Sequence, residues 1–167
     1  AISRGVESVT NTTAVIRTVN SKHYAESDDL LVSKEDLKNC SGMIIGSPTH
    51  FGNMAAPLKE FFDNTTEEWL NNTLESKLGG VFTSTSSMHG GQETTLLSMM
   101  LPLFHHGMLI AGVPYSVKEL SSTKSGGTPY GPSHVAHNQN SELTSEEKAI
   151  CISYGKRFAQ IINGMNI

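Results

Sequence analysis

The chain has 167 residues, 37% of them hydrophobic and 17% charged, which is the size and composition of one globular domain with a sizeable core. Its formal net charge is −4 and no run of lysine or arginine stands out, which argues against nucleic acid or an anionic membrane surface as a partner. No apolar run is long enough to span a membrane, and no signal peptide opens the chain. Cys40 and Cys151 have neither metal nor redox spacing, so we expect a reducing, cytoplasmic environment.

The first half of the chain predicts a helix, then strands and helices in alternation. Ile2, Val6 and Val9 recur at helical spacing, so the sequence begins within or at the edge of a helix. The elements that follow are a strand at 12–19, a polar loop at 20–29, a short helix from Ser33, a buried strand at 42–46 and a helix at 55–63.

The second half continues the alternation. A polar loop over 64–76 carries the single tryptophan, Trp69. The elements that follow are a strand at 78–84, a helix at 93–106 that Pro102 ends or kinks, a strand at 107–113 and a turn-rich segment at 121–140. The last helix is well marked, since Thr144 and Glu147 form a capping box and Gly164 lies just past its apolar face.

This alternation predicts an α/β fold, a single domain over residues 1–167. The strand runs are continuously apolar, which indicates parallel strands buried on both faces and hence an open twisted parallel sheet with helices on both faces. In such sheets ligands bind at the carboxyl ends of the strands. The turns at 46–53 and 83–92, which follow two of the strands, are therefore the segments to consider as a site.

Both turns are rich in glycine, short hydroxyls and flat or soft apolar side chains. Glycine lets backbone N–H groups approach a ligand closely, hydroxyls satisfy ring carbonyls, and Phe51 or Met88 offers an apolar wall. These are the features that a planar, partly polar heterocycle needs. The alternative interpretation is ordinary turn chemistry, because the same residue types dominate any turn.

The chain also resembles a known family. The stretch that begins "GSPTHFGNM" and continues through "VFTSTSSMHGGQETTLLSMMLPLFHHGMLIAGVPYS" to "GGTPYG" is similar to the WrbA family of flavodoxin-like, FMN-dependent NAD(P)H:quinone oxidoreductases. The similarity runs in consistent order from about residue 42 to 136. It implies a flavodoxin-like three-layer fold with FMN at the two turns.

The resemblance assigns residues to this site, and no metal ligands. Trp69 matches an aromatic residue that walls the pocket where nicotinamide or quinone stacks. His105 matches a position that reaches the flavin, of a neighbouring subunit, and is a candidate proton donor. "GGTPYG" (126–131) lies near the site or a subunit interface. The residues that match the two flavin loops are Pro48, Thr49, His50, Phe51, Gly52 and Asn53 in the first, and Ser84, Thr85, Ser86, Ser87, Met88, His89 and Gly90 in the second.

The implied activity is two-electron reduction of quinones by NAD(P)H, with FMN carrying the chemistry and the two substrates sharing one pocket in ping-pong order. The family also implies a homotetramer. Two alternatives stay open at this point: a flavodoxin-type electron carrier, and a flavin-free binding or scaffold protein. His134 and His137 have i, i+3 spacing but no third ligand, so we expect no metal site.

The N-terminus departs from the family pattern. A flavodoxin-like chain begins with a strand and a Ser/Thr-rich loop that holds the FMN phosphate at a helix N-terminus. This sequence begins within what looks like that helix, so we expect the N-terminal strand and phosphate loop, about twenty residues, to be absent. Without that strand, segments 12–19 and 42–46 would leave a gap between them or pair directly.

Overall fold

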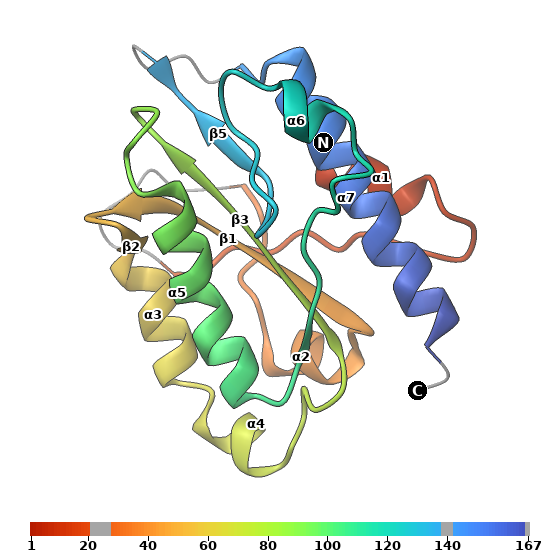
Figure 1. Ribbon diagram of the computed structural model, residues 1–167. Helices are drawn as coiled ribbons and strands as arrows, with labels where there is room; N and C mark the ends of the chain where they lie inside the picture. The colour runs from red at the N-terminus through yellow and green to blue at the C-terminus, as the bar shows by residue number, and fades with distance from the viewer. Residues whose placement is uncertain (21–27, 138–141, 166–167) are drawn as a thin grey trace.

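The computed structural model describes residues 1–20, 28–137 and 142–165, and places a central sheet between two groups of helices (Figure 1). The expected flavodoxin-like α/β architecture is confirmed. The elements, in chain order, are α1 (Ile2–Glu7), α2 (Lys34–Asn39), β1 (Gly42–His50), β2 (Asn53–Met54), α3 (Ala56–Asp63), α4 (Thr66–Leu70), β3 (Leu78–Thr85), α5 (Gln92–His105), β4 (Leu109–Ile110), α6 (Glu119–Ser122), β5 (Ser133–Val135) and α7 (Ser145–Gly164).

The sheet is parallel except at one tip. β1 and β3 pair in parallel from Gly42↔Leu78 to Pro48↔Ser84. β2 folds back on the end of β1 as a short antiparallel hairpin. β4 and β5 both pair in parallel with β3, β4 at the start of β3 and β5 at its end. The carboxyl ends of β1 and β3 therefore lie together, as a ligand site of this fold requires.

A tyrosine side chain fills the gap between β4 and β5. The buried Tyr154 hydroxyl accepts a hydrogen bond from the Val81 N–H at 3.1 Å and donates one to the Ala111 carbonyl at 3.0 Å. β4 and β5 are thus two halves of one interrupted strand, and the segment 111–132 between them leaves the sheet and returns. Since buried backbone groups need partners, Tyr154 supplies those that the interruption removes.

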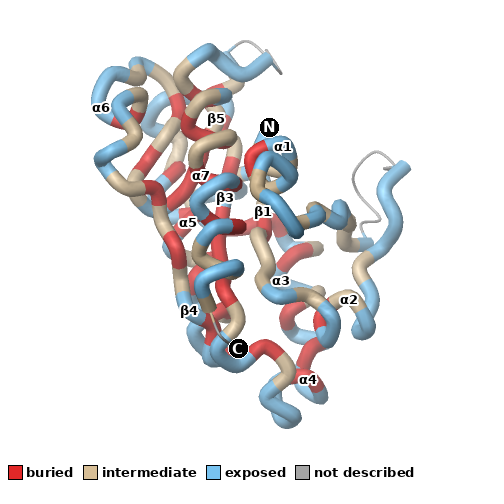
Figure 2. The backbone as a smooth tube through the Cα atoms, turned by 90° about the vertical axis from the view of Figure 1, so that its right-hand side faces the viewer, coloured by how far each residue is buried: buried red, intermediate tan, exposed pale blue. Residues whose placement is uncertain are grey.

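Two apolar clusters hold the layers together. One lies between the sheet and α3 and α5, and includes Val81, Leu96 and Met99. The other lies on the opposite face, where α7 packs Tyr154 and Phe158 toward the sheet. Figure 2 shows buried residues concentrated along β3, which is covered on both faces.

α1 packs closely on α7, on the face opposite α5 (Figure 1). A Cβ atom on Gly5 would lie 2.1 Å from the Ile152 carbonyl oxygen, and one on Gly155 would lie 2.1 Å from the Ile2 carbonyl oxygen. Only glycine fits at this crossing. The helical start predicted from the sequence is confirmed.

The predicted strand at 12–19 is wrong. Only Thr18 forms a bridge, to Leu31, while Val15 and Ile16 are exposed. The β-branched residues suit a strand, but a strand also needs a partner along its length. Within the described residues this segment does not pair with β1, so the direct pairing expected as one of the two alternatives is absent. The predicted loop at 20–29 lies mostly outside the described residues.

Three other segments differ from prediction. Trp69 lies on a short helix, α4, and not in a loop. Only Leu109–Ile110 of the predicted strand 107–113 is strand, because Val113 N–H donates to Pro129 O and the chain leaves the sheet. The turn-rich segment 121–140 contains β5. The predicted helix at 93–106 is confirmed as α5, which continues past Pro102 to His105.

Capping explains why the two predicted helix starts are confirmed. Ser33 and Asp36 form a capping box at α2, and Thr144 and Glu147 form one at α7. Among the described residues no helix is both long and apolar enough to cross a membrane.

Candidate functional site

The first of the two turns is a tight β-hairpin between β1 and β2. His50 pairs with Asn53, and the two residues between them, Phe51 and Gly52, have φ values of 53° and 76°. Two positive φ values are those of a type I′ turn, which normally takes Asn-Gly. Phe51 is fully exposed at the tip. A bulky residue held in left-handed backbone, with its ring in solvent, is a reason to look for a function there.

In the second turn, Ser86–Gly91, two backbone carbonyls accept hydrogen bonds from neighbouring residues. The Ser87 carbonyl accepts from the Thr85 hydroxyl at 2.9 Å and from the Gly90 N–H at 3.1 Å. The Met88 carbonyl accepts from the Gln92 side chain at 2.8 Å. In the described part of the chain, the N–H groups of Ser87, Met88 and His89 donate to no acceptor. The turn therefore has a run of three backbone donors that are unused within the described part of the chain.

The two turns touch each other. A Cβ on Gly91, whose φ is 92°, would lie 2.9 Å from the Gly52 Cα. Below them, hydroxyls link the elements: Thr95 donates to Thr49 at 3.1 Å, Thr49 lies 3.2 Å from the Thr83 hydroxyl, and Thr83 donates to the Ser47 carbonyl at 2.8 Å. The adjacency expected from the strand order is thus built by close glycine contact and a partly buried chain of hydroxyls.

The predicted residues of these loops differ in exposure. Thr49 and Thr85 are committed to bonds within the protein, so their hydroxyls shape the loops. Gly52 and Gly90 are half-buried. The residues whose side chains are exposed or half-buried at the surface are Pro48, His50, Phe51, Asn53, Ser84, Ser86, Ser87, Met88 and His89.

A further set of residues positions the second loop, and the sequence prediction missed it. Gln92 is buried, and besides holding the Met88 carbonyl it accepts from the Ser133 hydroxyl on β5. Ser133 in turn accepts from the Gly127 N–H at 2.7 Å. This chain connects the loop with "GGTPYG" (126–131), which therefore lies behind the site. The signal was the "GGQ" that opens α5, where a polar residue in a buried first turn needs partners.

Glu147 anchors the same region from α7. Its buried carboxylate accepts from His134 Nδ1 at 2.9 Å, the Gly126 N–H at 2.8 Å and the Val135 N–H at 3.0 Å, besides Ser125 and Thr144. Burial raises the pKa of this carboxyl, but the hydrogen bonds outweigh burial and lower it to about 2. His134, which pairs with Ser84 on the neighbouring strand β3, is thus held by an ionised Glu147.

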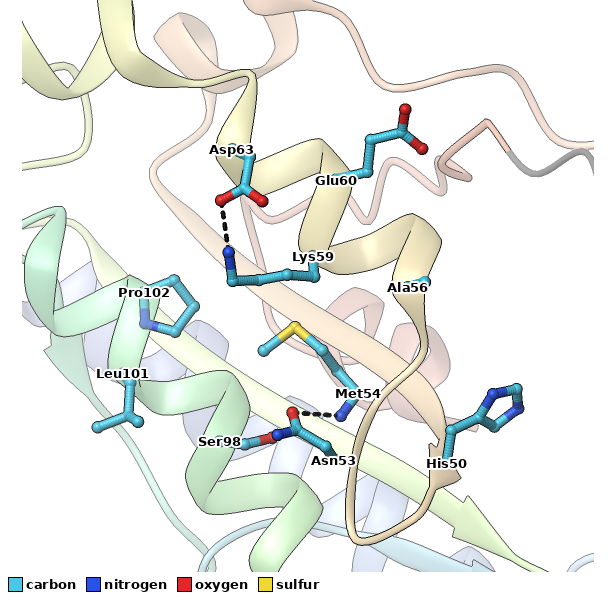
Figure 3. Close-up of a pocket in the computed structure, with 10 residues that line it drawn as sticks. All are labelled: His50, Asn53, Met54, Ala56, Lys59, Glu60, Asp63, Ser98, Leu101 and Pro102. Atoms are coloured by element: carbon cyan, nitrogen blue, oxygen red, sulfur yellow. Dashed lines mark hydrogen bonds and ion pairs between the residues drawn. The ribbon is translucent and has the colours of Figure 1, made fainter.

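A hollow of about 740 Å³ lies beside the first loop, between α3 and α5 (Figure 3). Met54, Leu101 and Pro102 give it an apolar floor, and the Lys59–Asp63 ion pair lies at its edge. His50 and Asn53 border it, with His50 pointing away from the other lining residues in Figure 3. The hollow is therefore next to the candidate site, on the outer side of the hairpin.

Trp69 and His105 lie together at the other end of the molecule. The half-exposed Trp69 donates its Nε1–H to the His105 carbonyl at 2.9 Å, and His105 is the last residue of α5. α5 begins at the second loop and runs away from it, and its 14 residues span about 20 Å. Figure 1 shows α4 at the bottom, far from the arrowheads of β1 and β3. Within a single copy of the chain, Trp69 and His105 therefore do not reach the two loops.

A mostly parallel sheet between two helix layers, with polar loops at the carboxyl ends of adjacent strands, defines a flavodoxin-like protein. Two solved structures share the fold: a WrbA-like flavodoxin from Agrobacterium tumefaciens, with a TM-score of 0.72 at 20% identity, covers 98% of this chain and 85% of its own. A flavodoxin from the domain Archaea has a TM-score of 0.62 at 18% identity, with 97% and 85% covered.

The sequence identifies the family. Residues 8–119 match the family model described as NADPH-dependent FMN reductase, and the chain belongs to this family. An NAD(P)H dehydrogenase (quinone) of Acidithiobacillus ferrooxidans is 46% identical over 130 residues, which is 76% of this chain and 65% of that protein. One of Chromohalobacter salexigens is 45% identical over 128 residues, 75% of this chain and 64% of that protein. The matched part of the chain thus spans less than two thirds of these relatives. The family recognised from the sequence is confirmed.

The two loops fit the flavin that the family implies. A flavin ring system presents carbonyl oxygens and ring nitrogens in one plane, and accepts hydrogen bonds along its edge. The unused N–H groups of Ser87, Met88 and His89 form such a donor edge. Met88 on the same loop, and Phe51 on the loop that touches it through Gly52 and Gly91, add exposed apolar surface.

Proposed function

We propose that the chain binds FMN between the loops 46–53 and 86–91 and belongs to an enzyme that reduces quinones with NAD(P)H. The family implies FMN as the cofactor, and its relatives named NAD(P)H dehydrogenase (quinone) support the substrates. The run of unused backbone donors beside Phe51 is the observation that carries the proposal. Bound FMN would supply two-electron hydride chemistry between NAD(P)H and a quinone, and the two loops would hold it so that both substrates use one face in ping-pong order.

The protein's part is to bind, orient and exclude water. The N–H groups of Ser87, Met88 and His89 hold the polar edge of the ring system, and Phe51 covers it. Gln92 and Ser133 keep the donors fixed, because each accepts or donates within a buried chain of hydrogen bonds. Ser84 and Ser86 supply hydroxyls at the same edge.

Trp69 and His105 act on the site of a neighbouring copy. They lie about the length of α5 from the loops of their own chain, and they are held together by the bond from Trp69 to the His105 carbonyl. In this arrangement the indole walls the pocket where nicotinamide or quinone stacks. The exposed His105 imidazole would donate a proton to the quinone oxygen that becomes a quinolate as the quinone is reduced.

A homotetramer supplies that neighbour. Leu97, Leu101 and Phe104 form an exposed apolar stripe along α5, at i, i+4 and i+7, and Leu101 also lines the hollow. An exposed stripe of this kind on a soluble domain marks an interaction surface. We also propose a cytoplasmic location, since Cys40 and Cys151 are both unpaired thiols.

Flavin titration tests the proposal. FMN added to the purified chain should lose fluorescence on binding, and Phe51→Ala should weaken binding by about tenfold. Glu93→Gln, an exposed change on the first turn of α5, is the matched control and should bind as the parent does. Oxidation of NADH with benzoquinone, giving parallel lines in double-reciprocal plots, then tests the ping-pong order. A chain that takes up no FMN contradicts the proposal, and accumulation of a one-electron reduced flavin favours an electron carrier.

A further inference from the structure

Two buried polar atoms behind α4 have no hydrogen-bond partner. They are Nδ1 of His106 and Oε2 of Glu68, and no other side-chain atom of the described residues is in this position. His106 is 8% exposed and Glu68 is 3% exposed. Since buried polar atoms are nearly always paired, these two call for a physical explanation.

The surrounding hydrogen bonds show which ring nitrogen of His106 carries its hydrogen. The Thr65 hydroxyl lies 2.7 Å from the Phe62 carbonyl oxygen, which can only accept, so the hydroxyl hydrogen is on that bond. His106 Nε2 lies 2.9 Å from the same hydroxyl oxygen and must therefore donate to it. In neutral His106 this leaves Nδ1 as a bare acceptor. Glu68 Oε2 is an acceptor too, so the pair lacks a hydrogen.

The charges around His106 come from several elements. Glu68 on α4 is close enough for its charge to raise the pKa of His106, whereas burial, the largest effect, lowers it and the adjacent His105 lowers it further. Lys34, at the start of α2, pairs with Glu68 Oε1 at 3.3 Å and also with Glu67. From α3, Phe62 packs its ring against the imidazole. The net effect places the His106 pKa below its usual value.

This cluster is joined directly to Trp69. Glu68 precedes it on α4, and its indole donates to the carbonyl of His105, the residue before His106. The Glu68 carboxylate and the indole of the next residue thus lie where α4 meets the end of α5, so a new bond from His106 to Glu68 would form at that contact.

We propose that His106 Nδ1 and Glu68 Oε2 form a proton-binding site that sets the position of Trp69. Nδ1 takes a proton from solvent on acidification, the new N–H donates to Oε2, and α4 is drawn toward α5. The site goes beyond the oxidoreductase function. Its evidence is the hydrogen bonding around α4, so its failure would leave flavin binding untouched.

Two measurements on the whole chain test it. Nitrogen-15 NMR of labelled histidine should show His106 with hydrogen on Nε2 alone at pH 7.5, and protonation of Nδ1 below pH 6.5. Trp69 is the only tryptophan, so its fluorescence reports on α4 without interference. The fluorescence change and the NMR titration should share one midpoint, with far-UV circular dichroism constant throughout.

Variants separate this proton site from other titrations. Glu68→Gln should give the fluorescence of the acid form at pH 7.5 and lose the transition, because its amide donates to Nδ1. Lys34→Met, an exposed change that strengthens the field of Glu68, should raise the midpoint. His137→Gln, at an exposed histidine elsewhere, should keep the transition. A hydrogen on Nδ1 at pH 7.5, a flat fluorescence profile as a buried bridging water would give, or an unchanged midpoint in Lys34→Met overturns the proposal.

Discussion

Phe51 occupies a backbone position that favours asparagine or glycine. Left-handed backbone costs a bulky residue about 1 kcal/mol, and Phe51 gains no packing within its own chain in return, since it is fully exposed. Phe51→Asn should therefore raise the free energy of unfolding in urea by about 1 kcal/mol. The same change should weaken FMN binding, because it removes the ring that we propose covers the flavin.

Phe51→Ala is the control for these two effects. Alanine also removes the ring but is as poorly suited to positive φ, so it should weaken FMN binding without stabilising the fold. A Phe51→Asn chain that is less stable than the parent would contradict the strain argument. Equal FMN affinity in all three chains would show that the ring does not touch the flavin.

At the scale of elements, Glu147 joins α7 to β5 and to the 126–131 loop. Because its folded pKa, about 2, is below the usual 4.5, the carboxylate stabilises the fold fully above pH 4.5. This contribution is lost as the pH falls from 4.5 toward 2. The shift corresponds to about 3 kcal/mol. Glu147→Gln should be less stable at pH 7 and should lose this part of the acid dependence, measured by urea unfolding across that range.

The exposed Glu93 provides the comparison. Glu93→Gln should keep the parental acid dependence, since Glu93 lies on the surface of α5. If Glu147→Gln follows the parent curve between pH 4.5 and 2, other groups cause the acid sensitivity.

The interrupted strand makes a second prediction at this scale. Tyr154→Phe keeps the packing of the ring but leaves the Val81 N–H and the Ala111 carbonyl buried without a partner. Such groups cost about 1–3 kcal/mol, and we expect a loss of about 2 kcal/mol in the free energy of unfolding. Amide exchange at Val81 should accelerate. Tyr115→Phe, at an exposed tyrosine, should change stability by less than about 0.5 kcal/mol.

The elements that sequence predicts correctly are those whose signals are local. The capping boxes at Ser33 and Thr144 mark helix starts within four residues, and the apolar runs of β1 and β3 need no knowledge of a partner. Segment 12–19 has the composition of a strand but lacks a partner along its length, so propensity alone misleads. β5 is three residues inside a turn-rich segment, and only its pairing with Thr83–Thr85 makes it a strand.

The candidate site divides in the same way. The sequence pointed to the two loops of the site because glycine, hydroxyl-bearing residues and Phe51 follow the buried strands directly. The sequences of these loops also resemble those of a known flavin-binding family. The roles of Ser133 and Glu147 at the site could not be predicted, since they depend on bonds between residues 12 to 41 positions apart. Gln92 gave only the signal of a polar residue in a buried first turn, without its partner on β5. The resemblance singled out Trp69 and His105, but the sequence did not show that they lie far from the two loops of their own chain. The helical pattern of a sequence does not indicate at which end of the sheet the helix terminates.

At the scale of the whole molecule, Leu101 is the position to test for assembly. It lies 61% exposed in the middle of the apolar stripe of α5, so a buried carboxylate there would oppose contact between copies. Leu101→Glu should lower the mass measured by light scattering to that of one chain, and should remove quinone reductase activity while FMN still binds. Leu30→Glu, at an exposed leucine outside α5, should keep the parental mass. A parental mass in Leu101→Glu would place the interface elsewhere.

The bond between Tyr154 and Val81 also has a consequence for how the protein is made. Val81 is synthesised 73 residues before Tyr154, whose hydroxyl accepts the hydrogen bond from the Val81 N–H. At ordinary rates of translation this is about 4–15 s, during which the middle of the sheet has a backbone donor without its partner. The strand can be completed only when the last helix has left the ribosome, so a nascent chain that stalls before residue 154 would carry an unfinished sheet.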